Sequence, residues 1–174
     1  MIGRLDAVPA LDRPDLLAEP VLAAVRALGL ANVLVAEIDP SVADTAAFCE
    51  RYAVGLDVSA NCVVVAGRRG SETTLAACMV LATDRADVNG VVRRRLDARK
   101  ASFAAMDVAV AETGMEYGGI TPIGLPAGWP ILVDERVDAT DQVIIGSGVR
   151  RSKLVVPGSL LAGLPGAQVI AVAV

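Results

Sequence analysis

The stretch EYGGITPIG, residues 116–124, places three glycines, a threonine and a proline between an expected helix and an expected strand. Glycine loses more conformational entropy on folding than any other residue. It is used where φ must be positive or where another group approaches the backbone closely. The stretch is therefore either a tight turn or a surface on which a ligand lies, and the residues alone leave both interpretations open.

Histidine is absent from the 174 residues, which excludes Ser-His-Asp and Cys-His catalysis and any histidine-ligated metal site. The three cysteines, Cys49, Cys62 and Cys78, fit neither a zinc pattern nor a CxxC motif. Cys62 and Cys78 lie in apolar runs, which favours buried, reduced thiols over reactive ones.

Composition narrows the class of protein further. Apolar residues make up 54% of the chain and aromatic residues only 3%, so the core must consist mainly of Val, Leu and Ala. A net charge of −4 argues against non-specific binding to long DNA or RNA but leaves a local basic patch open. The sequence shows no secretory signal and no apolar window of the roughly 18 residues that a spanning helix needs. We therefore expect a cytoplasmic protein with no membrane partner.

The order of apolar runs predicts one α/β domain over residues 20–174, preceded by an irregular lead-in over residues 1–19. Strands are expected in runs with helices inserted between them, which is typical of a mixed, largely antiparallel and barrel-like sheet with helices packed outside. The runs 61–67 and 73–82, joined by RRGSE, predict an antiparallel hairpin. Helices are expected over 20–28, 44–54, 88–96 and 107–113, and further strands over 32–38, 130–134, 142–146, 153–157 and the C-terminal run.

Several motifs in this order resemble the YbaK and prolyl-tRNA-synthetase-associated editing-domain family. They are LATDRADVNGVVRRRL, KASFA, ETGMEYGGITPIG, PILVDE and IIGSGVRRSKLVV. The most specific is the glycine loop, which resembles the family's GG(I/V)SPxG pattern with Thr121 in place of serine. The resemblance implies hydrolysis, without a metal or cofactor, of the ester that links a wrong amino acid to the 3′ end of a transfer RNA. Members act in trans or as a domain of a synthetase, so the implied partners are a mischarged aminoacyl-tRNA and an aminoacyl-tRNA synthetase.

The resemblance assigns roles to the residues of the glycine loop. Ester hydrolysis must stabilise a developing oxyanion, and backbone N–H groups in a fixed turn can do so. Gly118 and Gly119 would leave their amides uncovered for a terminal adenosine ester. Thr121 would add a hydroxyl group, and Pro122 would stiffen the turn.

One departure from the family pattern affects the chemistry. The family places a lysine at the start of the first hairpin strand, where this chain has Asn61. Asparagine can hydrogen-bond a substrate but cannot neutralise charge, whereas lysine brings a compact cation. The only lysines are Lys100 and Lys153, and neither takes this position by register. Arg150, in the GSGVRR turn, is the best replacement cation.

The remaining site residues are less specific. The same resemblance adds Ser147 and Gly148 to the substrate-binding set. Asp134 closes an apolar strand and either orients a substrate or forms an ordinary strand-end turn. The basic cluster of residues 93–95, 99 and 100 either contacts acceptor-stem phosphates or is a solvated helix face.

Three functions remain open at this level. The first is an aminoacyl-tRNA deacylase that relies on the glycine loop. The second is a module that has lost catalysis and binds transfer RNA, a synthetase or an aminoacyl-like ligand, because the family lysine is replaced. The third is a structural protein whose C-terminal strand pairs with another chain. Neither the amino acid recognised nor the oligomeric state follows from the sequence.

Overall fold

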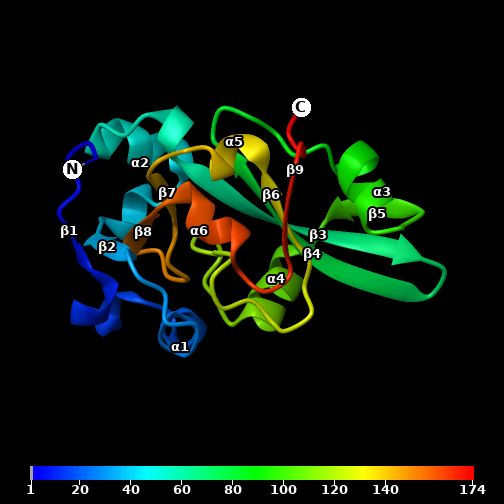
Figure 1. The fold of residues 1–174 in the computed structure, drawn as a ribbon, viewed down its shortest axis with the longest axis horizontal. Helices are drawn as coiled ribbons and strands as arrows, with labels where there is room; N and C mark the ends of the chain where they lie inside the picture. The colour runs from blue at the N-terminus through cyan, green and yellow to red at the C-terminus, as the bar shows by residue number, and fades with distance from the viewer. Residues whose placement is uncertain (1) are drawn as a thin grey trace.

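Two sheets form the framework of this computed structural model, which describes residues 2–174 (Figure 1). The first has the strand order β1-β2-β8-β7 and the second β5-β3-β4-β6-β9. The strands are β1 (Ala7–Pro9), β2 (Leu34–Glu37), β3 (Ala60–Arg69), β4 (Glu72–Leu81), β5 (Lys100–Phe103), β6 (Ile131–Asp134), β7 (Val143–Gly146), β8 (Ser152–Val156) and β9 (Ala167–Ile170). The α-helices are α1 (Glu19–Ala27), α2 (Thr45–Tyr52), α3 (Arg93–Arg95), α4 (Met106–Thr113), α5 (Glu135–Asp138) and α6 (Gly158–Ala162).

The predicted mixed α/β class is confirmed, and so is the largely antiparallel pairing. Only β4–β6 and β6–β9 are parallel among the paired strands of residues 2–174. The β3–β4 hairpin is antiparallel over its whole length, from Ala60 opposite Leu81 to Arg69 opposite Glu72. The barrel-like closure is wrong. Within residues 2–174, one isolated bridge beyond the ladders, between Ser59 and Ile144, joins the two sheets, so each sheet keeps its own edges.

Helices α1 and α2 cover opposite faces of the four-stranded sheet, because strand residues alternate between faces. On one face, Val21 of α1 packs in a cluster with Leu154. On the other, Phe48 of α2 packs in a cluster with Val155. The predicted positions of these helices outside the sheet are thus confirmed, and the face beneath α2 is the one that carries the site described below.

The N-terminal segment is more ordered than the expected lead-in. Strand β1 pairs with β2, and two 3₁₀ turns follow, Ala10–Asp12 and Pro14–Leu16. Leu16 is almost fully buried in the same cluster as α1. A strand of three residues and single 3₁₀ turns show too little periodicity to be read from a sequence.

The helix expected over residues 88–96 begins as a π-helix, Val88–Val92, and continues as α3. Asp87 caps it, since its carboxylate accepts hydrogen bonds from the amides of Gly90 and Val91, both at 3.1 Å. The packing of Val88 and Val92 against the five-stranded sheet places the next residue, Arg93, beside β5. No helix of residues 2–174 combines the length and the apolar character that crossing a membrane requires.

Candidate functional site

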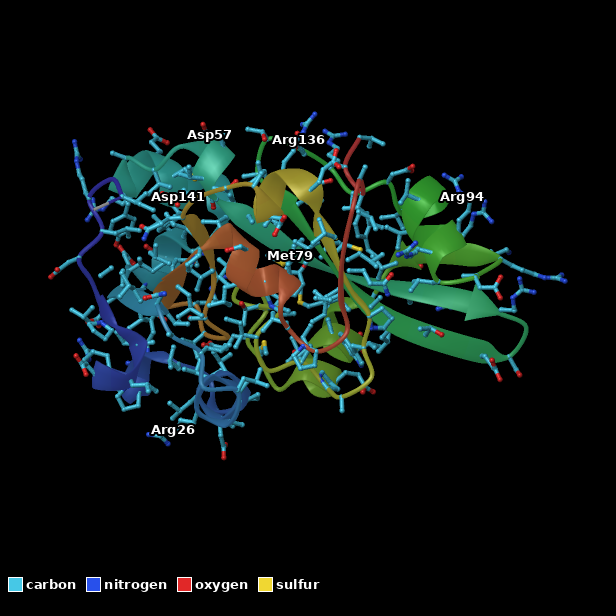
Figure 2. The ribbon with its side chains drawn as sticks, in the orientation of Figure 1. Arg26, Asp57, Met79, Arg94, Arg136 and Asp141 are labelled. Atoms are coloured by element: carbon cyan, nitrogen blue, oxygen red, sulfur yellow. The ribbon has the colours of Figure 1, made fainter. Side chains whose placement is uncertain are left out.

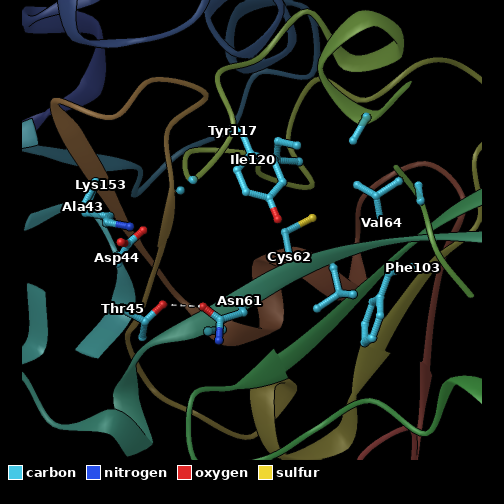
Figure 3. A pocket seen from close by; sticks show the side chains of 16 residues that line it. Ala43, Asp44, Thr45, Asn61, Cys62, Val64, Phe103, Tyr117, Ile120 and Lys153 are labelled. Atoms are coloured by element: carbon cyan, nitrogen blue, oxygen red, sulfur yellow. Dashed lines mark hydrogen bonds between the residues drawn. The ribbon is translucent and has the colours of Figure 1, made fainter. Parts of the chain in front are cut away.

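A cavity of about 430 Å³ opens between the N-terminal end of α2, the first half of β3 and the glycine loop (Figure 3). The four-stranded sheet closes it from one side through Gly146 and Lys153. Much of the wall is made of small apolar side chains, and the polar groups are few. The lining residues are Ala43, Asp44, Thr45, Ala60, Asn61, Cys62, Val63, Val64, Phe103, Ala104, Ala109, Tyr117, Gly118, Ile120, Gly146 and Lys153.

Lys153 is the only cation among the residues that line this cavity. It lies on β8, a strand with neighbours on both sides, opposite Ala36 and Gly146. Alternation along β8 points it to the same face as Val155, beneath α2. Its ammonium nitrogen lies 5.2 Å from the centre of the Phe48 ring, within the range of a cation–π contact. The residue is only 9% exposed.

The charge of Lys153 lacks a carboxylate partner. In the part of the chain that the structure describes, no acidic oxygen lies within 4.0 Å of its ammonium group. Asp44 lines the same cavity, but its side chain is 82% exposed and its ion pair, at 3.8 Å, is with Arg150. Burial lowers the pKa of Lys153, an effect that Arg150 reinforces and that Cys49 and Asp44 oppose. Burying a cation without a counter-ion lowers the stability of the folded protein. Stability therefore does not explain why Lys153 lies at this position.

Asn61 lies in the cavity wall, and its side chain is turned toward α2. Its carboxamide oxygen accepts a 2.7 Å hydrogen bond from the Thr45 hydroxyl (Figure 3). Cys62, the next residue, points instead toward Tyr117, which agrees with the expected alternation. Cys62 packs against the core and also lines the cavity. Burial strongly raises the pKa of its thiol, which opposes a thiolate nucleophile.

The glycine loop contributes Gly118 and Ile120 to the cavity. Gly118 has φ +89°, a conformation that glycine adopts without the strain an L side chain would suffer. Among residues 2–174, the amides of Gly118 and Ile120 donate no hydrogen bond to another protein group. Both residues line the cavity, so their N–H groups are candidate donors to a bound ligand.

Gly119 has a different role from the one predicted. Its amide donates a 2.9 Å hydrogen bond to the carbonyl of Glu116, so it is not free to bind an oxyanion. Its φ is not positive either. What requires glycine here is close approach, because a Cβ at Gly119 would lie only 2.8 Å from the carbonyl oxygen of Val149. Gly119 therefore fits the loop against the β7–β8 turn.

Thr121 and Pro122 lie outside the cavity. Thr121 is fully buried, and its hydroxyl finds no partner in the described chain. Pro122 lines a second hollow, on the side of the loop that faces α1. Neither residue is placed to touch a ligand that occupies the cavity, so their predicted contributions are limited to the conformation of the loop.

Asp134 and Ser147 are buried and already use their polar atoms within the fold. The carboxylate of Asp134 caps α5 at the amide of Arg136 and accepts hydrogen bonds from the amides of Val172 and Ala173. This is the strand-end interpretation that the sequence left open. The hydroxyl of Ser147 lies 3.1 Å from the carbonyl oxygens of both Val149 and Ser152, and its single proton is donated to one of them. Neither side chain lines the cavity.

Gly148 and Arg150 connect the β7–β8 turn to the glycine loop. The amide of Gly148 donates a 2.7 Å hydrogen bond to the carbonyl of Gly119. The Arg150 guanidinium donates to the carbonyl of Tyr117 and to that of Pro40, both at 3.3 Å. Arg150 thus clamps the cavity's edge, with its charge directed at backbone and at Asp44, while Lys153 supplies the cation inside. The sequence favours Arg150 over Lys153, because Lys153 does not take the position of the family lysine on β3, whereas in the structure it enters the cavity from β8.

No group of three metal-ligating side chains is found within the described residues. The arrangement instead combines an unpaired ammonium group, two free amides and a small apolar wall. Such a site can bind a neutral carbonyl compound and stabilise negative charge that develops on it.

Comparisons with known proteins show what this chain is similar to. A profile described as the aminoacyl-tRNA editing domain matches residues 39–164, which include every residue that lines the cavity. No curated protein gives a significant match. A crystal structure described as a candidate trans-editing enzyme for prolyl tRNA synthetase is similar, with 22% identity, a TM-score of 0.77 and coverage of 90% of this chain and 96% of that chain. The hypothetical protein APE2540 is also similar, with 20% identity, a TM-score of 0.79 and coverage of 90% and 100%. Because the matched segment is most of the chain, the protein belongs to the aminoacyl-tRNA editing domain family.

Proposed function

We propose that this protein is a trans-acting aminoacyl-tRNA deacylase that cleaves the ester of mischarged transfer RNA in the cavity described above. The observation that carries the proposal is the buried, unpaired ammonium group of Lys153 in the same cavity as the free amides of Gly118 and Ile120. Family membership supports the substrate class. Lys153 would supply the cation that this chain lacks at the position of the family lysine.

In this mechanism water attacks the ester carbonyl carbon, and the carbonyl oxygen becomes an oxyanion. The amides of Gly118 and Ile120, together with Lys153, stabilise that charge. The bond from the carbonyl carbon to the 3′ oxygen then breaks, and the 3′ oxygen takes up the proton that the attacking water gives up. The products are a free amino acid and a transfer RNA with a free 3′ hydroxyl. Exclusion of water by the apolar wall strengthens each of these electrostatic contacts.

The test is hydrolysis of a panel of mischarged transfer RNAs, followed as loss of the ester above its spontaneous rate. Proline-specific transfer RNA charged with small uncharged amino acids is tried first, because a similar structure is described for prolyl tRNA synthetase and the wall is made of small apolar residues. Turnover by the wild-type protein is the expected result. Absence of turnover over a panel that covers all amino acids would contradict the proposal.

A second candidate is a non-catalytic module that binds aminoacyl-tRNA or a synthetase in the same cavity. The observation that favours it is Asn61, which is neutral and already bonded to Thr45. Binding of mischarged transfer RNA without loss of its ester distinguishes this function from deacylation in the same experiment.

The pH dependence of the reaction follows from the protonation of Lys153. Only the ammonium form stabilises an oxyanion, and burial lowers the pKa of this group. We therefore expect kcat/KM, corrected for spontaneous hydrolysis, to fall as pH rises through this lowered pKa, before an ordinary lysine would titrate. Lys153→Arg should move the fall beyond the accessible range, since arginine stays protonated. A rate that rises over the same interval would contradict this role, because it would indicate that the neutral amine acts as a base.

A further inference from the structure

A groove with a basic lining lies at the far end of the same sheet. It has a volume of about 360 Å³ and lies between β5, the hairpin strand β3 and the π-helix. Its charged members are Arg68, Arg93, Arg99 and Lys100, and its other lining residues are Ala66, Asn89, Ala101 and Ser102. We call this the basic groove. No carboxylate lines it, although the chain as a whole has a net charge of −4.

The charges of the basic groove are not neutralised within the protein. Over residues 2–174, no carboxylate oxygen lies within 4.0 Å of Arg68, Arg99 or Lys100. Arg93 is oriented by backbone instead, with a 2.9 Å hydrogen bond from its Nε to the carbonyl of Asn89. Four cations that face one hollow are therefore available to an anionic ligand.

Two of these cations oppose each other directly in the sheet. Arg68 and Lys100 are register partners of the antiparallel strands β3 and β5, and both are exposed. Like charges at directly opposite positions destabilise an antiparallel pair. Two like charges that face each other without an acidic partner lower the stability of the sheet, and such a cost is typical of a functional position.

The basic groove and the catalytic cavity share two strands. On β3, residues 61–64 line the cavity, whereas Ala66 and Arg68 line the groove. On β5, Lys100 to Ser102 line the groove, and the strand ends at Phe103 in the cavity wall. At about 3.3 Å per strand residue, Arg68 lies roughly 20 Å along β3 from Asn61. An RNA strand whose terminal nucleotide occupies the cavity can thus contact the groove with phosphates that lie a few nucleotides upstream.

We propose that the basic groove binds the phosphates of the RNA strand that precedes the esterified terminal nucleotide. The inference rests on the proposed function, because it takes the cavity as the place of the ester. Arginine and lysine are the usual phosphate ligands, and Asn89 and Ser102 add neutral groups able to bond phosphate or sugar oxygens. The groove would hold the strand in register without reading its sequence, so that the ester reaches Lys153.

The test compares Arg68→Gln/Lys100→Gln with Arg4→Gln/Arg26→Gln, which removes the same charge from exposed positions elsewhere. In Figure 2, Arg26 lies at the lower left of the molecule and Arg94, a neighbour of the groove, at the upper right. The probe is an uncharged transfer RNA transcript, whose binding is followed by fluorescence anisotropy over a range of salt concentrations. We expect the groove variant to weaken binding about tenfold and to reduce the slope of log K against log salt by about 1.4, while the control changes neither. The melting temperature of the groove variant should equal that of the wild type or exceed it, because the substitutions remove the like-charge pair.

A second measurement separates this inference from the proposed function. An aminoacyl ester of adenosine alone lacks the upstream phosphates, so the groove variant should hydrolyse it at the wild-type rate while its KM for the full mischarged transfer RNA rises. If wild type cleaves both substrates and the groove variant matches the control in affinity and salt slope, the groove is a solvated surface or binds a protein, and the inference is wrong. If wild type cleaves neither substrate, the proposed function fails, whereas the binding experiment still decides on the groove.

Discussion

Lys153→Met should reduce deacylation by about a hundredfold or more without weakening the fold. The size of this reduction is that expected when one preorganised group that stabilises an oxyanion is lost. Methionine keeps the length and the contact with Phe48 while it removes the charge. Because burial lowers the pKa of Lys153, the folded protein binds this proton less tightly than the unfolded chain does. Stability therefore rises with pH between the lowered pKa and the ordinary one, and at neutral pH the charge is a penalty that the substitution removes.

The matched measurement is the melting temperature, which should be equal or higher in Lys153→Met. A second substitution then tests whether position or charge matters. Asn61→Lys on the Lys153→Met background returns a cation to the same cavity from β3, the position that the family pattern uses. We expect it to recover a substantial part of the lost activity. A folded Lys153→Met variant with wild-type turnover would show that the cation has no part in the reaction.

Much of the fold is predictable because long apolar runs determine it. The hairpin of β3 and β4 has ten residues in each strand, and its polar turn leaves one pairing register. The α-helices α1 and α2 follow from apolar residues spaced one turn apart, such as Val21 and Val25. Closure of the sheet was not predictable. It depends on how strands far apart in sequence meet, and here a bridge between Ser59 and Ile144 takes the place of a continuous ladder between the sheets.

The site was predictable only where it is local in sequence. The glycine loop and the strand start at Asn61 do line one cavity, and the motifs identified both. Lys153 could not be assigned in this way, since it enters the cavity from a strand some ninety positions after Asn61. The signal in the sequence was strand alternation: Lys153 lies two residues before Val155 in RSKLVVP and therefore on the same face of the strand. Motif comparison alone does not use this alternation. Asp134 and Ser147 show the converse error, because polar residues at conspicuous positions often satisfy buried backbone groups.

Gly119→Ala is expected to lower kcat roughly 10²- to 10³-fold, an effect comparable to the loss of an oxyanion donor. The reason is steric. A methyl group at Gly119 would lie within 3.0 Å of the N, C and O atoms of Val149, and backbone atoms cannot give way as a flexible side chain does. The loop must shift, and the amides of Gly118 and Ile120 move with it. The same crowding should lower the free energy of unfolding by about 1–3 kcal/mol.

Gly124→Ala provides the matched control, because it separates the loss of stability from the loss of geometry. Gly124 belongs to the same loop, has φ +94°, and a Cβ there would meet the backbone of Pro20 and Val21. It faces the second hollow and not the catalytic cavity. We therefore expect Gly124→Ala to melt earlier but to keep its kcat at temperatures where it stays folded. If the two alanine variants lose stability alike and both retain kcat, the loop amides do not bind the oxyanion, and catalysis must rest on Lys153 and the cavity wall alone.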